Sequence, residues 1–200
     1  MMTMADADKT RLALLDAAYE EIYRNGFQSA SLNTILQRTG VTKGALYHHF
    51  SSKLKLGYTV VDEIISHKLD EDWLTPMQRT GHPINILIEV IQQAGQKMTR
   101  EEIQLGCPLN NLAQEMSPID PGFRQRIDLL YRQWHQGIER LLIDGQQSGA
   151  VRSTVNPADT ALFILASIEG CLGIAKNSQS IDELKRCAEG LFGYLETLRS

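Results

Sequence analysis

Apolar residues recur at helical spacing along nearly the whole chain, and this periodicity limits the possible folds more than any other feature. The first such stripe ends at Gly26 and consists of Leu12, Leu15, Tyr19 and Ile22. Further helix starts are marked by a proline directly after a capping-type residue, at His82-Pro83, Cys107-Pro108, Asp120-Pro121 and Asn156-Pro157. No segment shows the sustained alternation of a β-strand or a hairpin signal. The sequence therefore predicts an all-α protein with about nine helices.

Chain length and cysteine content narrow the class of protein further. The 200 residues, 42% of them hydrophobic, can form a buried core without a disulfide or metal. The longest uninterrupted apolar run, 161–166, is far shorter than the ~20 residues that span a bilayer, and the N-terminus lacks the apolar stretch of a signal peptide. Three widely spaced cysteines are typical of a reducing compartment. We expect a cytoplasmic protein with no membrane partner, in which Cys171 and Cys187 are packing residues.

The charge is distributed unevenly along the chain. The net charge is −4, but residues 1–57 carry seven Lys and Arg against five Asp and Glu, whereas the remainder carries thirteen against nineteen. The N-terminal segment is therefore mildly basic and the rest of the chain is acidic. This asymmetry favours a polyanion-binding module attached to a domain with another role.

Two short helices, predicted over 31–38 and 43–49, flank a tight turn at Thr39-Gly40-Val41. This spacing is typical of a helix-turn-helix, whose second helix enters the major groove of DNA. Hydroxyl, amine and imidazole groups here can bind phosphates or base edges, and Gly44 allows the helix to approach the DNA closely. The predicted DNA-binding residues are Ser31, Thr34, Thr42, Lys43, Gly44, Tyr47, His48 and Lys53.

The residues from Thr42 to Phe50, followed by Ser52-Lys53, are more specific than the helix spacing. Together with Gly26-Phe27, Ser31, Ile35 and Gly40-Val41, they make the segment 12–56 resemble the DNA-binding domain of the TetR/AcrR family of bacterial transcriptional regulators. The segment departs from the family pattern at three positions. Leu36 and Thr39 stand where alanine is usual, and Leu54 replaces an acidic residue that would favour a helix N-terminus.

The resemblance implies two domains with different functions. Residues 1–51 would form a helix-turn-helix DNA-binding domain, and residues 52–200 a ligand-binding and dimerisation domain. The implied partners are double-stranded operator DNA, a small-molecule effector and a second copy of the chain. Most members of the family repress transcription and leave the DNA when the effector binds, so we expect a homodimeric repressor.

The last two predicted helices carry apolar stripes that could pair two subunits. Apolar residues between 181 and 198 follow a near-heptad spacing, and the preceding helix has a second stripe beside small residues. The same stripes could face the core of their own subunit, but the resemblance favours an interface. The predicted interface residues are Leu165, Ile168, Leu172, Leu184, Leu191 and Leu195.

Aromatic residues mixed with a few polar groups indicate an effector site between 52 and 147. The candidates are Trp73, Met98, Cys107, Asn110, Tyr131 and Trp134, for each of which an ordinary core or surface role is the alternative. Cys107 follows Gly106 at a predicted helix start, where amides and the helix dipole would stabilise a thiolate. Family members with such a Gly-Cys pair resemble sensors of electrophiles or oxidants; the alternative is an inert, buried thiol.

Catalytic motifs are missing from the sequence. None of the five histidines has metal-ligand spacing, and no GxSxG, GxGxxG or phosphate-binding glycine loop occurs. We therefore expect that the protein is not an enzyme and has no metal site or cofactor. We expect instead a regulator that a small molecule releases from its operator. Two alternatives stay open: an all-α ligand-binding or enzymatic protein with a non-functional DNA-binding head, and a cysteine-based electrophile- or redox-sensing repressor.

Overall fold

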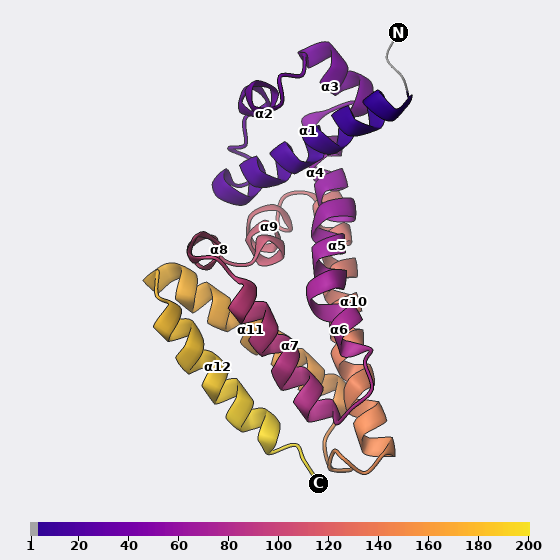
Figure 1. Cartoon of the computed structure of the whole chain (residues 1–200), viewed down its shortest axis with the longest axis vertical. Helices are drawn as coiled ribbons and strands as arrows, with labels where there is room; N and C mark the ends of the chain where they lie inside the picture. Colours follow the sequence, from indigo (N-terminus) through magenta and orange to yellow (C-terminus); the bar gives the residue numbers. More distant parts are fainter. Residues whose placement is uncertain (1–3) are drawn as a thin grey trace. The chain divides into compact units, whose positions relative to one another are not determined.

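A computed structural model describes residues 4–200, and its regular elements are all helical (Figure 1). The all-α fold class predicted from the sequence is confirmed. The elements are α1 (Met4–Asn25), α2 (Leu32–Thr39), α3 (Lys43–His49), α4 (Lys53–Thr59), η1 (Val60–Ile65), α5 (Ser66–Leu69), η2 (Asp70–Leu74), α6 (Thr75–Met77), α7 (Pro83–Lys97), α8 (Arg100–Leu105), α9 (Pro108–Met116), α10 (Pro121–Gln147), α11 (Pro157–Ser178) and α12 (Ile181–Glu196).

Local capping explains where many of these helices begin. The four prolines that mark helix starts in the sequence are the first residues of α7, α9, α10 and α11, as predicted. At α11 the side chain of Asn156 accepts hydrogen bonds from the amides of Ala158 and Asp159. The helical run from Lys53 to Met77 is continuous but contains two π-helical turns, η1 and η2.

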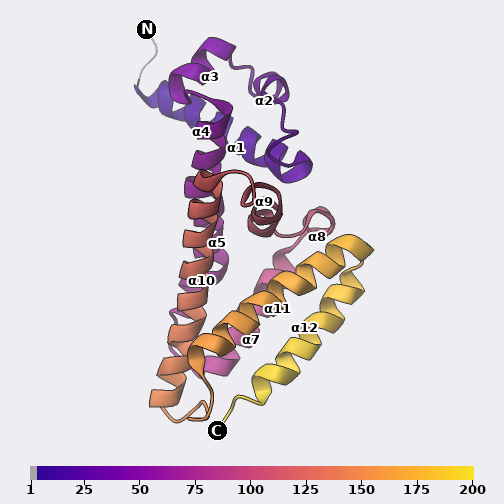
Figure 2. The same cartoon turned by 180° about the vertical axis from the view of Figure 1, so that it is seen from behind.

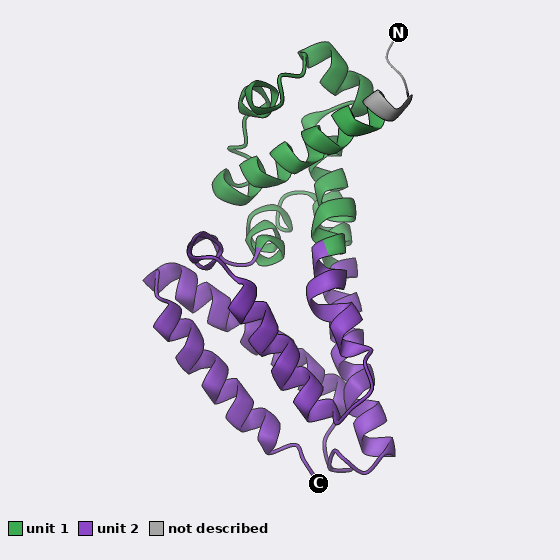
Figure 3. Ribbon diagram, viewed as in Figure 1, with its two compact units in different colours: residues 1–67, 108–128 green, residues 68–107, 129–200 purple. Residues whose placement is uncertain are grey.

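The chain divides into two compact units that do not coincide with the expected domains (Figure 3). The first unit contains residues 1–67 and 108–128, and the second contains 68–107 and 129–200. The unit with the N-terminal helices thus also takes in α4, η1, α9 and the first turns of α10. The expected division between residues 51 and 52 lies inside this unit, because α9 packs against η1, and Glu115 and Phe123 contact the loop that follows α1.

Each unit has its own apolar core. In the first unit Leu15, Leu46 and Phe123 are completely buried. In the second unit α11 and α12 lie side by side, as both views show (Figures 1 and 2). Among the described residues, only α11 has the length and mean hydropathy of a membrane-spanning helix, but 44% of its apolar window is buried, as in the core helix of a folded domain.

A disulfide between Cys171 of α11 and Cys187 of α12 corrects the expectation that both are packing residues. Their Cα atoms are 5.6 Å apart, within the range that a disulfide can bridge. Cys107 is not part of a disulfide. The odd number of cysteines concealed this pair, because a sequence does not reveal which residues of two helices face each other.

Candidate nucleic-acid interface

The turn between α2 and α3 has the backbone geometry of a helix-turn-helix. Gly40 ends α2 with a φ of 67°, a left-handed conformation that favours glycine, and its amide donates to the carbonyl of Leu36. The side chains of Ser31 and Thr42 cap α2 and α3 by accepting hydrogen bonds from the amides of Thr34 and Ala45. Two of the predicted DNA-binding residues therefore also define the helix starts.

The outer face of α3 exposes most of the predicted contact groups. Lys43, Gly44, Tyr47 and His48 are exposed, whereas Leu46 on the opposite face is fully buried. The ammonium of Lys43 lies 6.0 Å from the ring centroid of Tyr47. A Cβ atom built on Gly44 would have no heavy atom within 4 Å, so none of the described residues requires a glycine at that position.

Residues of α2 and α3 line an open hollow of about 220 Å³ at this face. Ser31, Lys43 and Tyr47, all predicted DNA-binding residues, line it. Asn33, also in the lining and exposed, was not predicted, although its amide can donate to phosphates or pair with a base edge. Its position in the first turn of α2, close to Ser31 and Thr34, is the sequence signal that could have identified it.

Lys53 has a structural contact that the sequence did not suggest. Its Nζ atom donates to the backbone carbonyl of Gln28 at 2.9 Å and lies 5.0 Å from the ring centroid of Phe27. The side chain therefore holds the loop before α2. A phosphate contact by Lys53 stays a prediction, because a lysine ammonium has three hydrogen-bond donors.

Two carboxylates missed in the sequence hold this same loop. Glu21, buried on α1, accepts from the amide of Ser31 at 3.0 Å. Glu115 on α9 accepts from the amides of Phe27 and Gln28, both at 2.8 Å. These bonds fix the chain directly before α2 and thus the start of the helix-turn-helix. Local sequence patterns do not reveal a partner 88 residues away.

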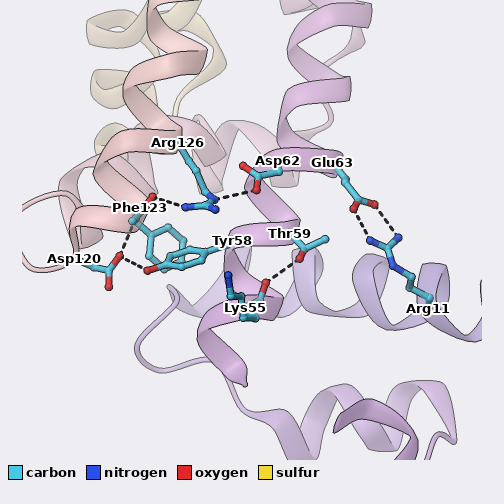
Figure 4. Close-up of polar contacts among 10 residues, drawn as sticks. Arg11, Lys55, Tyr58, Thr59, Asp62, Glu63, Asp120, Phe123 and Arg126 are labelled. Carbon is cyan, nitrogen blue, oxygen red and sulfur yellow. Dashed lines mark hydrogen bonds and ion pairs between the residues drawn. The ribbon is translucent and has the colours of Figure 1, made fainter. Parts of the chain in front are cut away.

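Ion pairs and hydrogen bonds also join α1, η1 and the start of α10 (Figure 4). Arg11 donates two hydrogen bonds to the carboxylate of Glu63, and these bonds hold the pKa of Glu63 below its ordinary value. The phenol of Tyr58 donates to Asp120 at 2.8 Å. The pKa of Tyr58 is raised, mainly because the phenol is desolvated by burial and also because of this hydrogen bond. The amide of Phe123 donates to Asp120 and is the main cause of the lowered pKa of this carboxyl.

The six predicted effector residues lie in separate places. Trp73 and Met98 line an apolar cavity of about 70 Å³ in the second unit, and Trp134 packs against Trp73 with ring centroids 4.5 Å apart. Cys107 and Tyr131 instead lie near Glu169, which accepts a hydrogen bond from the Cys107 thiol at 3.3 Å. Burial raises the pKa of Tyr131, and the nearby Glu169 adds to that increase. Asn110 belongs to the first unit.

Four of the six predicted dimer-interface residues are buried inside their own unit, as in the alternative interpretation, and the other two are partly exposed. Leu165, Ile168, Leu191 and Leu195 are at most 6% exposed, and Leu172 and Leu184 line the apolar cavity. The four buried residues therefore belong to the core between α11 and its neighbours, which corrects their assignment, and an interface role for the partly exposed Leu172 and Leu184 stays a prediction. The exposed apolar residues of α11 are instead Leu162, Phe163 and Ile174, on the opposite face of the helix.

Family models match both parts of the chain. Residues 14–56 match the bacterial regulatory proteins of the tetR family, and residues 83–190 match the C-terminal domain of LmrA/YxaF-like transcriptional regulators. The transcriptional repressor DhaR of Mycobacterium sp. (strain GP1) is 26% identical over 183 residues, which cover 86% of this chain and 87% of DhaR.

Other relatives extend the likeness along nearly the whole chain. The regulator LmrA of Bacillus subtilis is 26% identical over 186 residues, or 91% of this chain and 96% of LmrA. A TetR transcriptional regulator from Chloroflexus aurantiacus has the same fold, with a TM-score of 0.87 at 24% identity over 98% of both chains. With the helix-turn-helix geometry described above, these matches show that the chain belongs to the TetR family of DNA-binding transcriptional regulators.

Proposed function

We propose that this TetR-family regulator is a homodimeric, cytoplasmic repressor that binds a pseudo-palindromic operator and is released by a small-molecule effector. The observation that carries the DNA-binding mode is the open space at Gly44, beside Lys43 and Tyr47. Glycine weakens a helix by up to about 1 kcal/mol relative to alanine, and no described neighbour in this chain requires it. A surface that approaches from outside the chain accounts for it, and the exposed hydrogen-bonding groups around it suit DNA.

The exposed face of α11 supports a second copy of the chain as the dimer partner. Leu162, Phe163 and Ile174 are each more than half exposed, which is unusual for three large apolar residues on one helix face. Small residues between them allow a helix of the partner to approach. This dimer face consists of Leu162, Phe163, Ala166, Gly170, Gly173 and Ile174.

The repressor part of the proposal rests on the relatives, since DhaR is a transcriptional repressor and spans nearly the same length. The effector part rests on the apolar cavity lined by Trp73 and Met98. A cavity of about 150 Å³ holds benzene, so 70 Å³ suits a smaller apolar group or part of a larger molecule. We therefore propose an effector with an apolar portion.

Cys107 supports a second candidate, release by covalent reaction with an electrophile. Its thiol donates a hydrogen bond to the carboxylate of Glu169 at 3.3 Å, so this carboxylate lies where it can accept the thiol proton. Reaction would require the proton to pass to Glu169 as the sulfur attacks. Treating the operator complex of wild type and Cys107→Ser with an electrophile separates the candidates. Release of wild type alone supports covalent sensing, and equal behaviour excludes it.

The proposed DNA binding is tested by letting the full-length protein select duplexes from a random pool. We expect a pseudo-palindrome with half-sites about one helical turn or somewhat more apart, because the protein dimer and its site share a two-fold axis. Selected sites without two-fold symmetry would contradict the dimer, and no enrichment at all would contradict the function.

The salt dependence of binding to the selected duplex tests the docking of α3. Lys43→Ala should flatten the slope of log affinity against log salt by about 0.9 for each phosphate that the variant no longer neutralises. Arg152, exposed in the second unit, supplies the matched control, and Arg152→Ala should leave the slope unchanged. An unchanged slope in Lys43→Ala would place the phosphate-binding groups elsewhere.

A further inference from the structure

The disulfide of the second unit connects two helices through side chains that differ in exposure. Cys171 on α11 is 5% exposed, whereas Cys187 on α12 is partly exposed. The two cysteines are 16 positions apart in the sequence, and the chain between them turns at Gln179 and Ser180. A Cα separation of 5.6 Å is ordinary for a disulfide, so the pair can close without a rearrangement of the helices.

The compartment in which a DNA-binding regulator works makes this bond unusual. Glutathione and thioredoxin keep cytosolic thiols reduced, and cytosolic disulfides are mostly transient and catalytic or redox-sensing. A disulfide between α11 and α12 in such a protein is therefore one that the cell can both form and break. The partial exposure of Cys187 gives a small thiol or disulfide access to one of the two sulfurs.

The bond also lies in the wall of the apolar cavity. Cys171 lines this cavity together with Leu172 of α11 and with Leu184, Ala188 and Leu191 of α12. One side of the cavity is thus made by the two helices that the disulfide joins. While the bond is closed, α12 cannot move away from α11 at this wall, whereas in the dithiol form only packing holds it.

We propose that Cys171 and Cys187 form a reversible redox site that exchanges with glutathione disulfide and sets how firmly α12 closes the cavity. The thiolate of Cys187 attacks one sulfur of glutathione disulfide, forming a mixed disulfide and releasing one glutathione thiolate. Cys171 then attacks the sulfur of Cys187 and releases the second glutathione. Two electrons pass to glutathione disulfide, and the two cysteine protons are taken up by the released thiolates.

This site regulates the effector cavity if the proposed function holds, but its redox chemistry can be tested without DNA. The full-length protein is equilibrated in glutathione buffers of increasing oxidised fraction, quenched with acid and alkylated with N-ethylmaleimide. We expect intact mass to change from three alkylated cysteines to one across the titration. Cys107→Ser, the matched control, should change from two to none. Alkylation that does not depend on the glutathione ratio, or a disulfide that includes Cys107, would overturn the proposal.

The structural effect is measured by amide hydrogen exchange of the reduced and oxidised wild type. Exchange in α12 should be roughly tenfold or more faster in the dithiol form, because the crosslink removes states in which α12 separates from α11. Peptides from α2 should not change. Cys187→Ser should match the reduced wild type under both conditions, and if it fails to fold, the two wild-type forms still give the comparison. Equal exchange in both forms overturns the effect on α12.

Operator binding distinguishes failure of this redox site from failure of the proposed function. If the protein selects an operator but its alkylation does not depend on the glutathione ratio, the proposed function is supported and the redox site is contradicted. If the glutathione titration gives the expected change in mass but the protein selects no operator, the proposed function is contradicted and the redox site is supported.

Discussion

The carboxylate of Glu115 on α9 accepts a hydrogen bond of 2.8 Å from the backbone amide of Phe27, in the turn that follows α1. Its second oxygen accepts from the next amide, that of Gln28. Gly26 ends α1 at a φ of 77°, and a Cβ atom there would lie 2.9 Å from the Glu115 carboxylate. One side chain of α9 therefore sets the path of the chain into α2.

Glu115→Ala should weaken operator binding and lower stability, because two backbone amides lose their acceptor. We expect the free energy of unfolding in urea to fall by about 1–3 kcal/mol. Glu115→Gln, which keeps one carbonyl acceptor, should have an intermediate effect on both quantities. Glu189→Gln on the exposed face of α12 is the control. Unchanged operator affinity in Glu115→Ala would show that this carboxylate does not position α2 for DNA.

Gly44→Ala provides a sharper test of the DNA interface than a bulky replacement alone. The added methyl group meets no described atom of this chain, so the helix should become more stable by up to about 1 kcal/mol. Operator affinity should nevertheless fall, and Gly44→Leu should lower it further, by about tenfold or more, because each added carbon holds α3 away from the groove. Thermal unfolding and fluorescence anisotropy with labelled operator measure the two effects. Affinity that rises with helix stability would argue against close approach at Gly44.

Ile174→Glu should separate the subunits without unfolding them. Ile174 is 55% exposed in the single chain, so its charge becomes buried only in the dimer. Leu195 is fully buried, and Leu195→Glu should unfold the subunit instead. Light scattering with circular dichroism distinguishes a folded monomer from an unfolded chain. Leu129, also 55% exposed but on α10, gives a matched control whose Glu variant should remain dimeric. A dimeric Ile174→Glu protein would place the interface on another face.

Acid should destabilise the protein through carboxyls whose pKa is lowered in the folded state. Hydrogen bonds from Arg11 lower the pKa of Glu63 below its ordinary 4.5. Its stabilisation is therefore complete above that value and is lost as the pH falls through the folded pKa. Urea unfolding should show a decreasing free energy below about pH 4.5. The Glu63→Gln variant should be less stable than wild type at pH 7, and its free energy of unfolding should fall less on acidification. If its free energy of unfolding fell as much as that of wild type, the acid effect would belong to other groups.

Interactions between near neighbours explain what could be predicted from the sequence. The proline-marked starts of α7, α9, α10 and α11 depend on residues within one helical turn, and so do the caps at Ser31 and Thr42. The turn at Gly40 depends on one backbone conformation that glycine adopts readily. The sequence therefore determined the helices, the helix-turn-helix and the exposed residues of α3 that we predict to contact DNA, all by local geometry.

The remaining features depend on which helix faces meet, and only the tertiary structure decided them. The apolar stripe with Leu191 and Leu195 has the same periodicity whether it faces a partner or its own core, and its burial shows the latter. Cys171 meets Cys187, and Glu115 meets Phe27, because packing brings separate helices together. Periodicity gives the direction of a side chain around its own helix, but its partner depends on how that helix packs against others, which is a property of the whole chain.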